Sequence, residues 1–205
     1  MIDCNLLFRQ FLIVFLFSLG IFPSNPVQAE TGVQENEIII GMSNALSVPA
    51  SDLGIGIKQG AQAYFDRINQ DGGVHGRKIT VISLDDGYEP KRTFLNTTNL
   101  ISESKVFALF GFVGTPTAKA VLPLINREKI LFFSPFTGAE FLRNPVNRFI
   151  FNVRRSYFDE AERQVQYLTK TLGIKKIGVF LQNDAYGLAV KGGILKALKT
   201  RGLEI

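Results

Sequence analysis

The chain has 205 residues, of which 46% are apolar and 20% are charged, and its net charge is +5. This composition predicts a folded globular protein, because enough apolar surface can be buried to offset the entropy lost on folding. The single cysteine and single histidine exclude a disulfide framework, a Cys/His zinc site and a histidine-dependent catalytic triad. The basic residues are scattered, so we expect no nucleic-acid partner. We also expect no metal and no cofactor. Enzymatic function is disfavoured, with serine–lysine or paired-carboxylate chemistry as the remaining options.

The first 29 residues predict a secretion signal. Residues 11–22 form an apolar run, and small side chains stand at Val27 and Ala29, where a signal peptidase would cut after Ala29. A membrane anchor is the alternative, but a span needs about 20 apolar residues and this run has twelve. Cys4 precedes the run, whereas a lipoprotein cysteine would follow it. We therefore expect an exported protein that begins at Glu30.

Strand-like and helix-like segments alternate along the rest of the chain. Apolar or β-branched runs predict strands at 37–42, 78–84, 106–112, 130–133, 149–153 and 176–181. Apolar residues at helical spacing predict helices over 54–70, from Pro90 onward, from Thr115 onward, over 157–172 and over 188–200. Thr115 and Pro116 are expected as the N-cap and first-turn proline of the third helix, which Pro123 should kink or shorten. The alternation predicts an α/β fold with parallel sheets flanked by helices.

In such sheets ligands bind beyond the carboxyl ends of the strands. The corresponding loops are 43–53, 85–89, 113–117, 134–139 and 182–187, and hydroxyl side chains recur in them, at Ser47, Thr115, Thr137 and Tyr186 among others. Each hydroxyl could instead serve as a helix cap or turn former. Their repetition beside glycines and helix N-termini favours a site for a small carboxylate or another polar ligand. We expect the Thr115 hydroxyl and the Thr117 amide to face the anionic group.

Several motifs in this order resemble a known family. They are Ile38 to Ser43, Asp52-Leu53-Gly54, Gly60-Ala61, Ile68-Asn69, Gly72-Gly73-Val74-His75-Gly76-Arg77, Asp85-Asp86, Phe110-Gly111, Ser134-Pro135, Val153-Arg154 and Asn183-Asp184-Ala185-Tyr186-Gly187. Together they resemble the type I periplasmic solute-binding proteins of the leucine/isoleucine/valine-binding family over residues 37–202. The resemblance implies two α/β lobes that close on an amino acid or similar solute and deliver it to the permease of an ABC transporter. It also implies a periplasmic location.

The resemblance also assigns ligand contacts. The loops after the third and fourth strands of the first lobe supply most of them, at Gly114, Thr115, Thr117, Ser134, Phe136, Thr137 and Gly138. Leu53 stands where some relatives place an aromatic residue against the ligand side chain, and Tyr186 matches a tyrosine of the second lobe. A ligand-sensing receptor with the same fold is the alternative function. A dinucleotide site is disfavoured because the spacing of Gly54, Gly56 and Gly60 fails by one residue.

The lengths of the segments predict an incomplete second lobe. We expect a signal peptide at 1–29, an N-terminal lobe at 30–153 and only the start of a second lobe at 154–205. Such a chain, a truncated copy or non-functional gene fragment, should expose an apolar edge, bind solute weakly and associate. Asp85 and Asp86 are expected to be turn residues at a strand end rather than an acid/base pair, and His75 a solvated turn residue.

Overall fold

A computed structural model describes residues 30–47 and 50–205, so the predicted signal peptide lies outside the described residues. Its centre is a five-stranded sheet in the order β2-β1-β3-β4-β5, in which every pair of neighbours is parallel. The strands are β1 Glu37–Asn44, β2 Lys78–Asp85, β3 Ala108–Phe110, β4 Leu131–Phe133 and β5 Ile150–Phe151. The predicted strands at 106–112 and 149–153 are therefore shorter than expected. Because all strands run the same way, their carboxyl ends meet at one edge.

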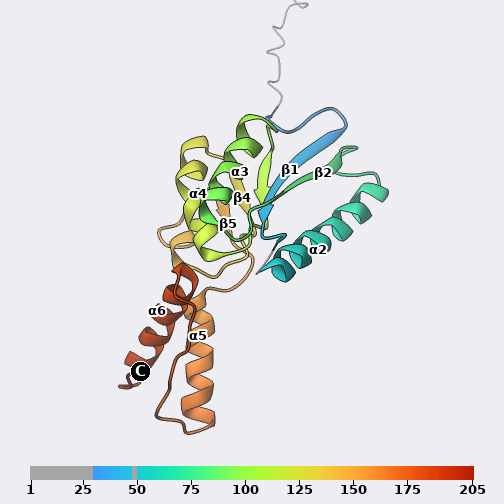
Figure 1. Cartoon of the computed structure of the whole chain (residues 1–205). Helices are drawn as coiled ribbons and strands as arrows, with labels where there is room; N and C mark the ends of the chain where they lie inside the picture. The colour runs from blue at the N-terminus through green and yellow to red at the C-terminus, as the bar shows by residue number, and fades with distance from the viewer. Residues whose placement is uncertain (1–29, 48–49) are drawn as a thin grey trace, which may run out of the picture.

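Helices cover both faces of this sheet (Figure 1). The helices of this part are α2 Ser51–Gln70, α3 Pro90–Ser102 and α4 Thr115–Glu128, followed by a 3₁₀ turn, Glu140–Leu142. Figure 1 shows α2 on one side of the sheet and α3 with α4 on the other. The α/β fold predicted from the sequence is confirmed.

The main core lies between the sheet and the α3–α4 pair. Leu100 of α3, Leu109 of β3 and Val121 of α4 are fully buried there. Phe112 and Phe132 meet edge to face in the same core, with ring centroids 5.1 Å apart. This packing fixes the ends of β3 and β4, from which two loops of the candidate site begin.

Helix α4 differs from its prediction at both ends. Gly114, rather than Thr115, is the N-cap, and Thr115 is the first helical residue. The helix continues past Pro123 to Glu128, so the predicted shortening is wrong. Leu124 and Ile125, which follow the proline, are buried in the core, and this apolar contact offsets the hydrogen bond that proline cannot donate.

A second unit extends away from the sheet after β5. It consists of α5 Tyr157–Gln166, a π-helical turn Tyr167–Thr171 and α6 Ala185–Lys199. The two helices pack closely, and a Cβ atom added to Gly193 of α6 would lie 2.9 Å from the Tyr157 carbonyl oxygen. None of the helices in the described part of the chain is long and apolar enough to cross a membrane.

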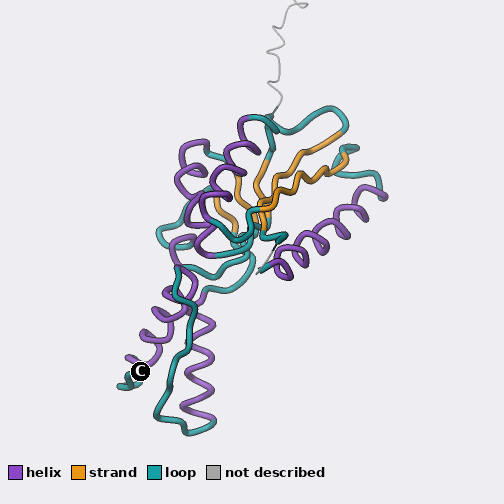
Figure 2. Tube along the Cα trace, in the orientation of Figure 1, coloured by secondary structure: helices purple, strands orange, loops and turns teal. Residues whose placement is uncertain are grey.

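The connection between α5 and α6 contains no strand (Figure 2). The prediction of a strand at 176–181 is therefore wrong. A strand needs a hydrogen-bonded neighbour, and no other described segment pairs with these residues. Phe180, in the middle of the connection, has a fully exposed side chain. Leu188 and Leu195 of α6 are also exposed.

Candidate functional site

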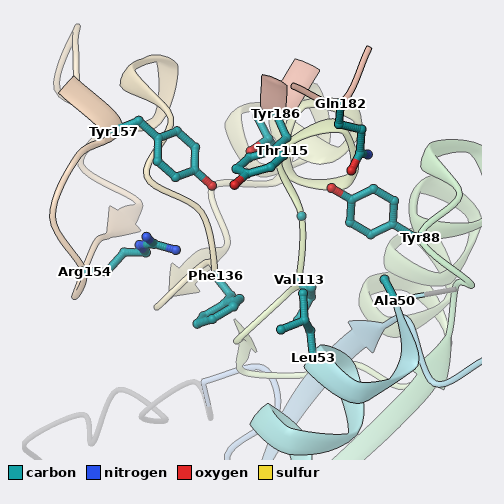
Figure 3. A pocket seen from close by; sticks show the side chains of 11 residues that line it. Ala50, Leu53, Tyr88, Val113, Thr115, Phe136, Arg154, Tyr157, Gln182 and Tyr186 are labelled. Carbon is teal, nitrogen blue, oxygen red and sulfur yellow. The ribbon is translucent and has the colours of Figure 1, made fainter. Parts of the chain in front are cut away.

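A cavity of about 350 Å³ opens at the carboxyl edge of the sheet, beside the α5–α6 unit (Figure 3). Its lining comes from the segments after all five strands and from the start of α6: Ala50, Leu53, Tyr88, Val113, Gly114, Thr115, Phe136, Arg154, Tyr157, Gln182 and Tyr186. The parallel arrangement of the strands explains why loops far apart in the sequence converge here. The cavity is the size of a small-molecule site.

Two hydrogen bonds hold the loop after β3 in place. Asn44, the last residue of β1, accepts a hydrogen bond from the Val113 amide at 2.8 Å. The Phe136 amide donates to the Phe112 carbonyl oxygen, also at 2.8 Å, and thereby joins the loops after β3 and β4. At Gly114 the backbone has φ +114°, which requires glycine in practice. The two hydrogen bonds and the conformation of Gly114 fix the position of the loop after β3, which forms part of the cavity wall.

The acidic pair at the end of β2 organises loops. The Asp85 carboxylate accepts hydrogen bonds from five groups, the Leu46 and Ser47 amides, the Ser47 hydroxyl, the Gly87 amide and the Arg92 guanidinium. Burial raises the pKa of Asp85, but these hydrogen bonds outweigh it and the pKa lies well below its usual value. The buried Asp86 accepts from the Ser43 hydroxyl, the Thr93 hydroxyl and the Tyr88 amide, yet burial raises its pKa. Neither residue lines the cavity, which agrees with a structural role.

The threonine hydroxyls near the cavity bond mainly to one another and to the backbone. Thr115 Oγ1 lies 2.7 Å from Thr137 Oγ1, which in turn donates to the Tyr157 hydroxyl at 3.3 Å. Thr117 Oγ1 donates to the Val113 carbonyl oxygen at 2.6 Å. We expected the Thr115 hydroxyl to face an anion from a helix N-terminus. The structure engages this hydroxyl with Thr137, 22 residues away, and the expected contact with an anion stays a prediction.

The structure brings five of the nine predicted site residues to the cavity wall: Leu53, Gly114, Thr115, Phe136 and Tyr186. The other four, Thr117, Ser134, Thr137 and Gly138, do not line it. Two of these four residues contact lining residues from outside the cavity. Thr137 bonds to Thr115 and Tyr157, and the Gly138 carbonyl oxygen accepts the Tyr157 amide at 2.7 Å. A Cβ atom on Gly138 would lie 2.7 Å from Tyr157 Cδ1, so glycine is needed for this close approach.

Sequence reasoning assigned no ligand contact to the six other lining residues: Ala50, Tyr88, Val113, Arg154, Tyr157 and Gln182. The Arg154 guanidinium lies 5.5 Å from the Phe136 ring centroid and 5.2 Å from that of Tyr157. It also forms an ion pair with Glu160 at 2.5 Å. The only signal for this residue was its place in the Val153-Arg154 motif.

Three tyrosines make much of the wall. The rings of Tyr157 and Tyr186 meet edge to face with centroids 5.4 Å apart, and Tyr88 lies on the opposite side of the opening (Figure 3). Burial, together with the negative charge of Asp184, raises the pKa of Tyr88 to about 12. Its hydroxyl is therefore neutral near pH 7 and can both donate and accept a hydrogen bond.

This α/β fold, with a cavity at the carboxyl edge of a parallel sheet, is that of a known protein family. A family model described as "Periplasmic binding protein" matches residues 37–205. The chain belongs to this family, which confirms the resemblance drawn from the sequence. Members of the family are solute-binding proteins.

Individual relatives agree with this assignment. A Leu/Ile/Val-binding protein homolog 3 from Brucella melitensis is 26% identical, over 82% of this chain and 45% of its own length. A possible leucine/isoleucine/valine-binding protein from Rhodopirellula baltica superposes with a TM-score of 0.79 and is 39% identical over 89% of this chain and 47% of its own. A fatty acid ABC transporter substrate-binding protein from Thermomonospora curvata gives a TM-score of 0.77 and 28% identity, over 88% of this chain and 46% of its own. The chain thus spans about half the length of the relatives that it matches.

Proposed function

We propose that the chain binds a small solute in the cavity between the sheet and the α5–α6 unit, as the extracytoplasmic binding component of an ABC transporter. One observation carries this proposal: the carboxyl ends of five parallel strands and the start of α6 converge on a single cavity. The role is reversible binding without a chemical step. The ligand contacts include the five predicted residues at the wall: Leu53, Gly114, Thr115, Phe136 and Tyr186.

The names of the relatives support an amino acid or related carboxylate as the solute. They refer to leucine, isoleucine, valine and a fatty acid, all of which combine a carboxylate with an apolar body. The cavity offers a comparable mixture of apolar and polar side chains. The proposal includes a permease partner at the membrane, a periplasmic location, export by residues 1–29 and a boundary between two lobes near residue 153.

Titration of the purified chain with a panel of solutes tests the proposal. The chain has no tryptophan, and three of its five tyrosines line the cavity, so tyrosine fluorescence reports on the site. We expect saturable binding of at least one carboxylate from a panel of leucine, isoleucine, valine, aromatic acids and fatty acids, with one site by calorimetry.

A pair of tyrosine variants locates the binding. Tyr186→Ala removes an aromatic wall and should abolish binding, whereas Tyr64→Ala removes an exposed tyrosine of α2 that does not line the cavity. The Tyr64 variant should bind as the unaltered chain does. If no member of the panel binds, or if both variants bind equally well, the proposed function is refuted.

A further inference from the structure

We infer that the Arg154 guanidinium anchors the anionic group of the solute, and that the site prefers a small carboxylate with an aromatic body. This inference rests on the proposed function and specifies its ligand. Among the lining residues that the structure describes, Arg154 is the one with a formal charge near pH 7. Figure 3 shows its guanidinium directed into the space between Phe136 and Tyr157.

The guanidinium has donors left for a ligand. In the described part of the chain its side chain donates one hydrogen bond, from Nη2 to Glu160. A guanidinium carries five N–H donors in a planar fork that matches the two oxygens of a carboxylate. About a third of the side chain is exposed to solvent, so an incoming anion can reach it. The rings of Phe136 and Tyr157 hold the group in place without occupying its donors.

The hydroxyl groups of Thr115 and Thr117 are already engaged. The Thr115 hydroxyl pairs with Thr137, and the Thr117 hydroxyl donates to the backbone of Val113 and Gly114. These two threonines and their three partners, Thr137, Val113 and Gly114, are all buried. A charge-assisted hydrogen bond is stronger than a neutral one, so Arg154 is the strongest side-chain partner for an anion at the cavity wall.

The rest of the wall is suited to a flat ring. Four aromatic side chains line the cavity, at Tyr88, Phe136, Tyr157 and Tyr186. Phe136 and Tyr186 are 40% and 39% exposed, so they present uncovered ring surface to the cavity. Aromatic pairs in stacked or edge-to-face contact are more stable than buried area alone predicts. An aromatic body should thus bind more tightly than an aliphatic body of similar size.

Three solutes, phenylacetate, phenylacetamide and isovalerate, separate the contribution of the negative charge to binding from that of the aromatic ring. Phenylacetamide keeps the ring but lacks the charge, and isovalerate keeps the charge but lacks the ring. Measured by tyrosine fluorescence and calorimetry, phenylacetate should bind about tenfold or more tightly than phenylacetamide. It should also bind more tightly than isovalerate, leucine, isoleucine or valine.

Variants of the arginine and its partner separate ligand binding from a structural role. Arg154→Gln should remove the preference for phenylacetate over phenylacetamide, while Arg148→Gln should keep it. Arg148 is a matched control, because it also lies against a ring, that of Phe149, but outside the cavity. Glu160→Gln removes the carboxylate charge that competes with the solute for Arg154, and it should strengthen phenylacetate binding about threefold or more. If Arg154 served only to hold Glu160, both variants would weaken binding together.

The outcomes distinguish this inference from the function on which it rests. If solutes bind but the aliphatic acids bind most tightly, or if Arg154→Gln leaves the acid preference intact, the inference is overturned and the proposed function stands. Weaker phenylacetate binding by Glu160→Gln also overturns it, and this variant decides the matter should Arg154→Gln fail to fold. If neither panel of solutes binds, the proposed function fails and the inference with it.

Discussion

Replacing Gly114 with alanine is a direct test of how the loop after β3 shapes the cavity. Gly114 has φ +114° and ψ 146°, a backbone conformation that is accessible in practice only to glycine. An added Cβ atom would lie 2.6 Å from Tyr88 Cε2 and 2.7 Å from Thr117 Oγ1. Strain and overpacking each cost roughly 1–3 kcal/mol, so we expect the free energy of unfolding to fall by about 3 kcal/mol.

Urea unfolding followed by circular dichroism measures this loss. Gly60→Ala is the matched control, because Gly60 lies inside α2 and a Cβ atom there would contact nothing within 4 Å. That variant should gain about 0.5–1 kcal/mol from its higher helix propensity. Gly114→Ala should also lose solute binding, since Tyr88 must move. Unchanged stability and binding in Gly114→Ala would refute our account of this loop.

Three further predictions concern the surroundings of the cavity. Asp85→Asn should lower the unfolding free energy by about 2 kcal/mol at pH 7. Because the folded pKa of Asp85 is lowered, this contribution is present above pH 3.8 and is lost as the pH falls below it, so urea melts of the two proteins should converge in acid. Gly138→Ala should force Tyr157 from its position and lower solute affinity and melting temperature together, whereas wild-type values would show that the contact can relax. If Thr115 contacts ligand directly, Thr115→Val should weaken binding about tenfold and Thr137→Val less; equal losses would show that their mutual hydrogen bond is what matters.

Most strands and helices were predictable, because the patterns that indicate them lie within each segment of the sequence. The strands at 37–42, 78–84 and 130–133 and the helix from Pro90 follow from side-chain periodicity and proline position, and the structure contains all of them. The predicted strand at 176–181 fails for a different reason. Its β-branched residues make the segment suitable for a sheet. A strand forms only where a second strand pairs with it, and sequence periodicity does not reveal that partner.

The position of the cavity was predictable from the sequence, and the contacts within its wall only partly so. Parallel strands bring their carboxyl ends together, and this geometry located the loops that carry Leu53, Gly114 and Phe136. The direction of each hydroxyl depends instead on contacts between distant loops. The hydroxyls of Thr115 and Thr137 form a hydrogen bond although the two residues are 22 positions apart in the sequence. Nothing in the sequence around either residue predicts this bond.

Tyr157 shows why the unpredicted residues matter for the site. Its amide donates to Gly138 and its hydroxyl accepts from Thr137, so the first residue of α5 is tied to the loop after β4 through both backbone and side chain. Its ring meets Tyr186 at the start of α6 and the Arg154 guanidinium. The hydrogen bonds with Gly138 and Thr137 join the second unit to the sheet edge, whereas the ring contact with Tyr186 joins α5 to α6. The shape of the cavity therefore depends on Tyr157. The sequence shows this residue only as part of an amphipathic helix pattern, which predicts that its side chain is buried.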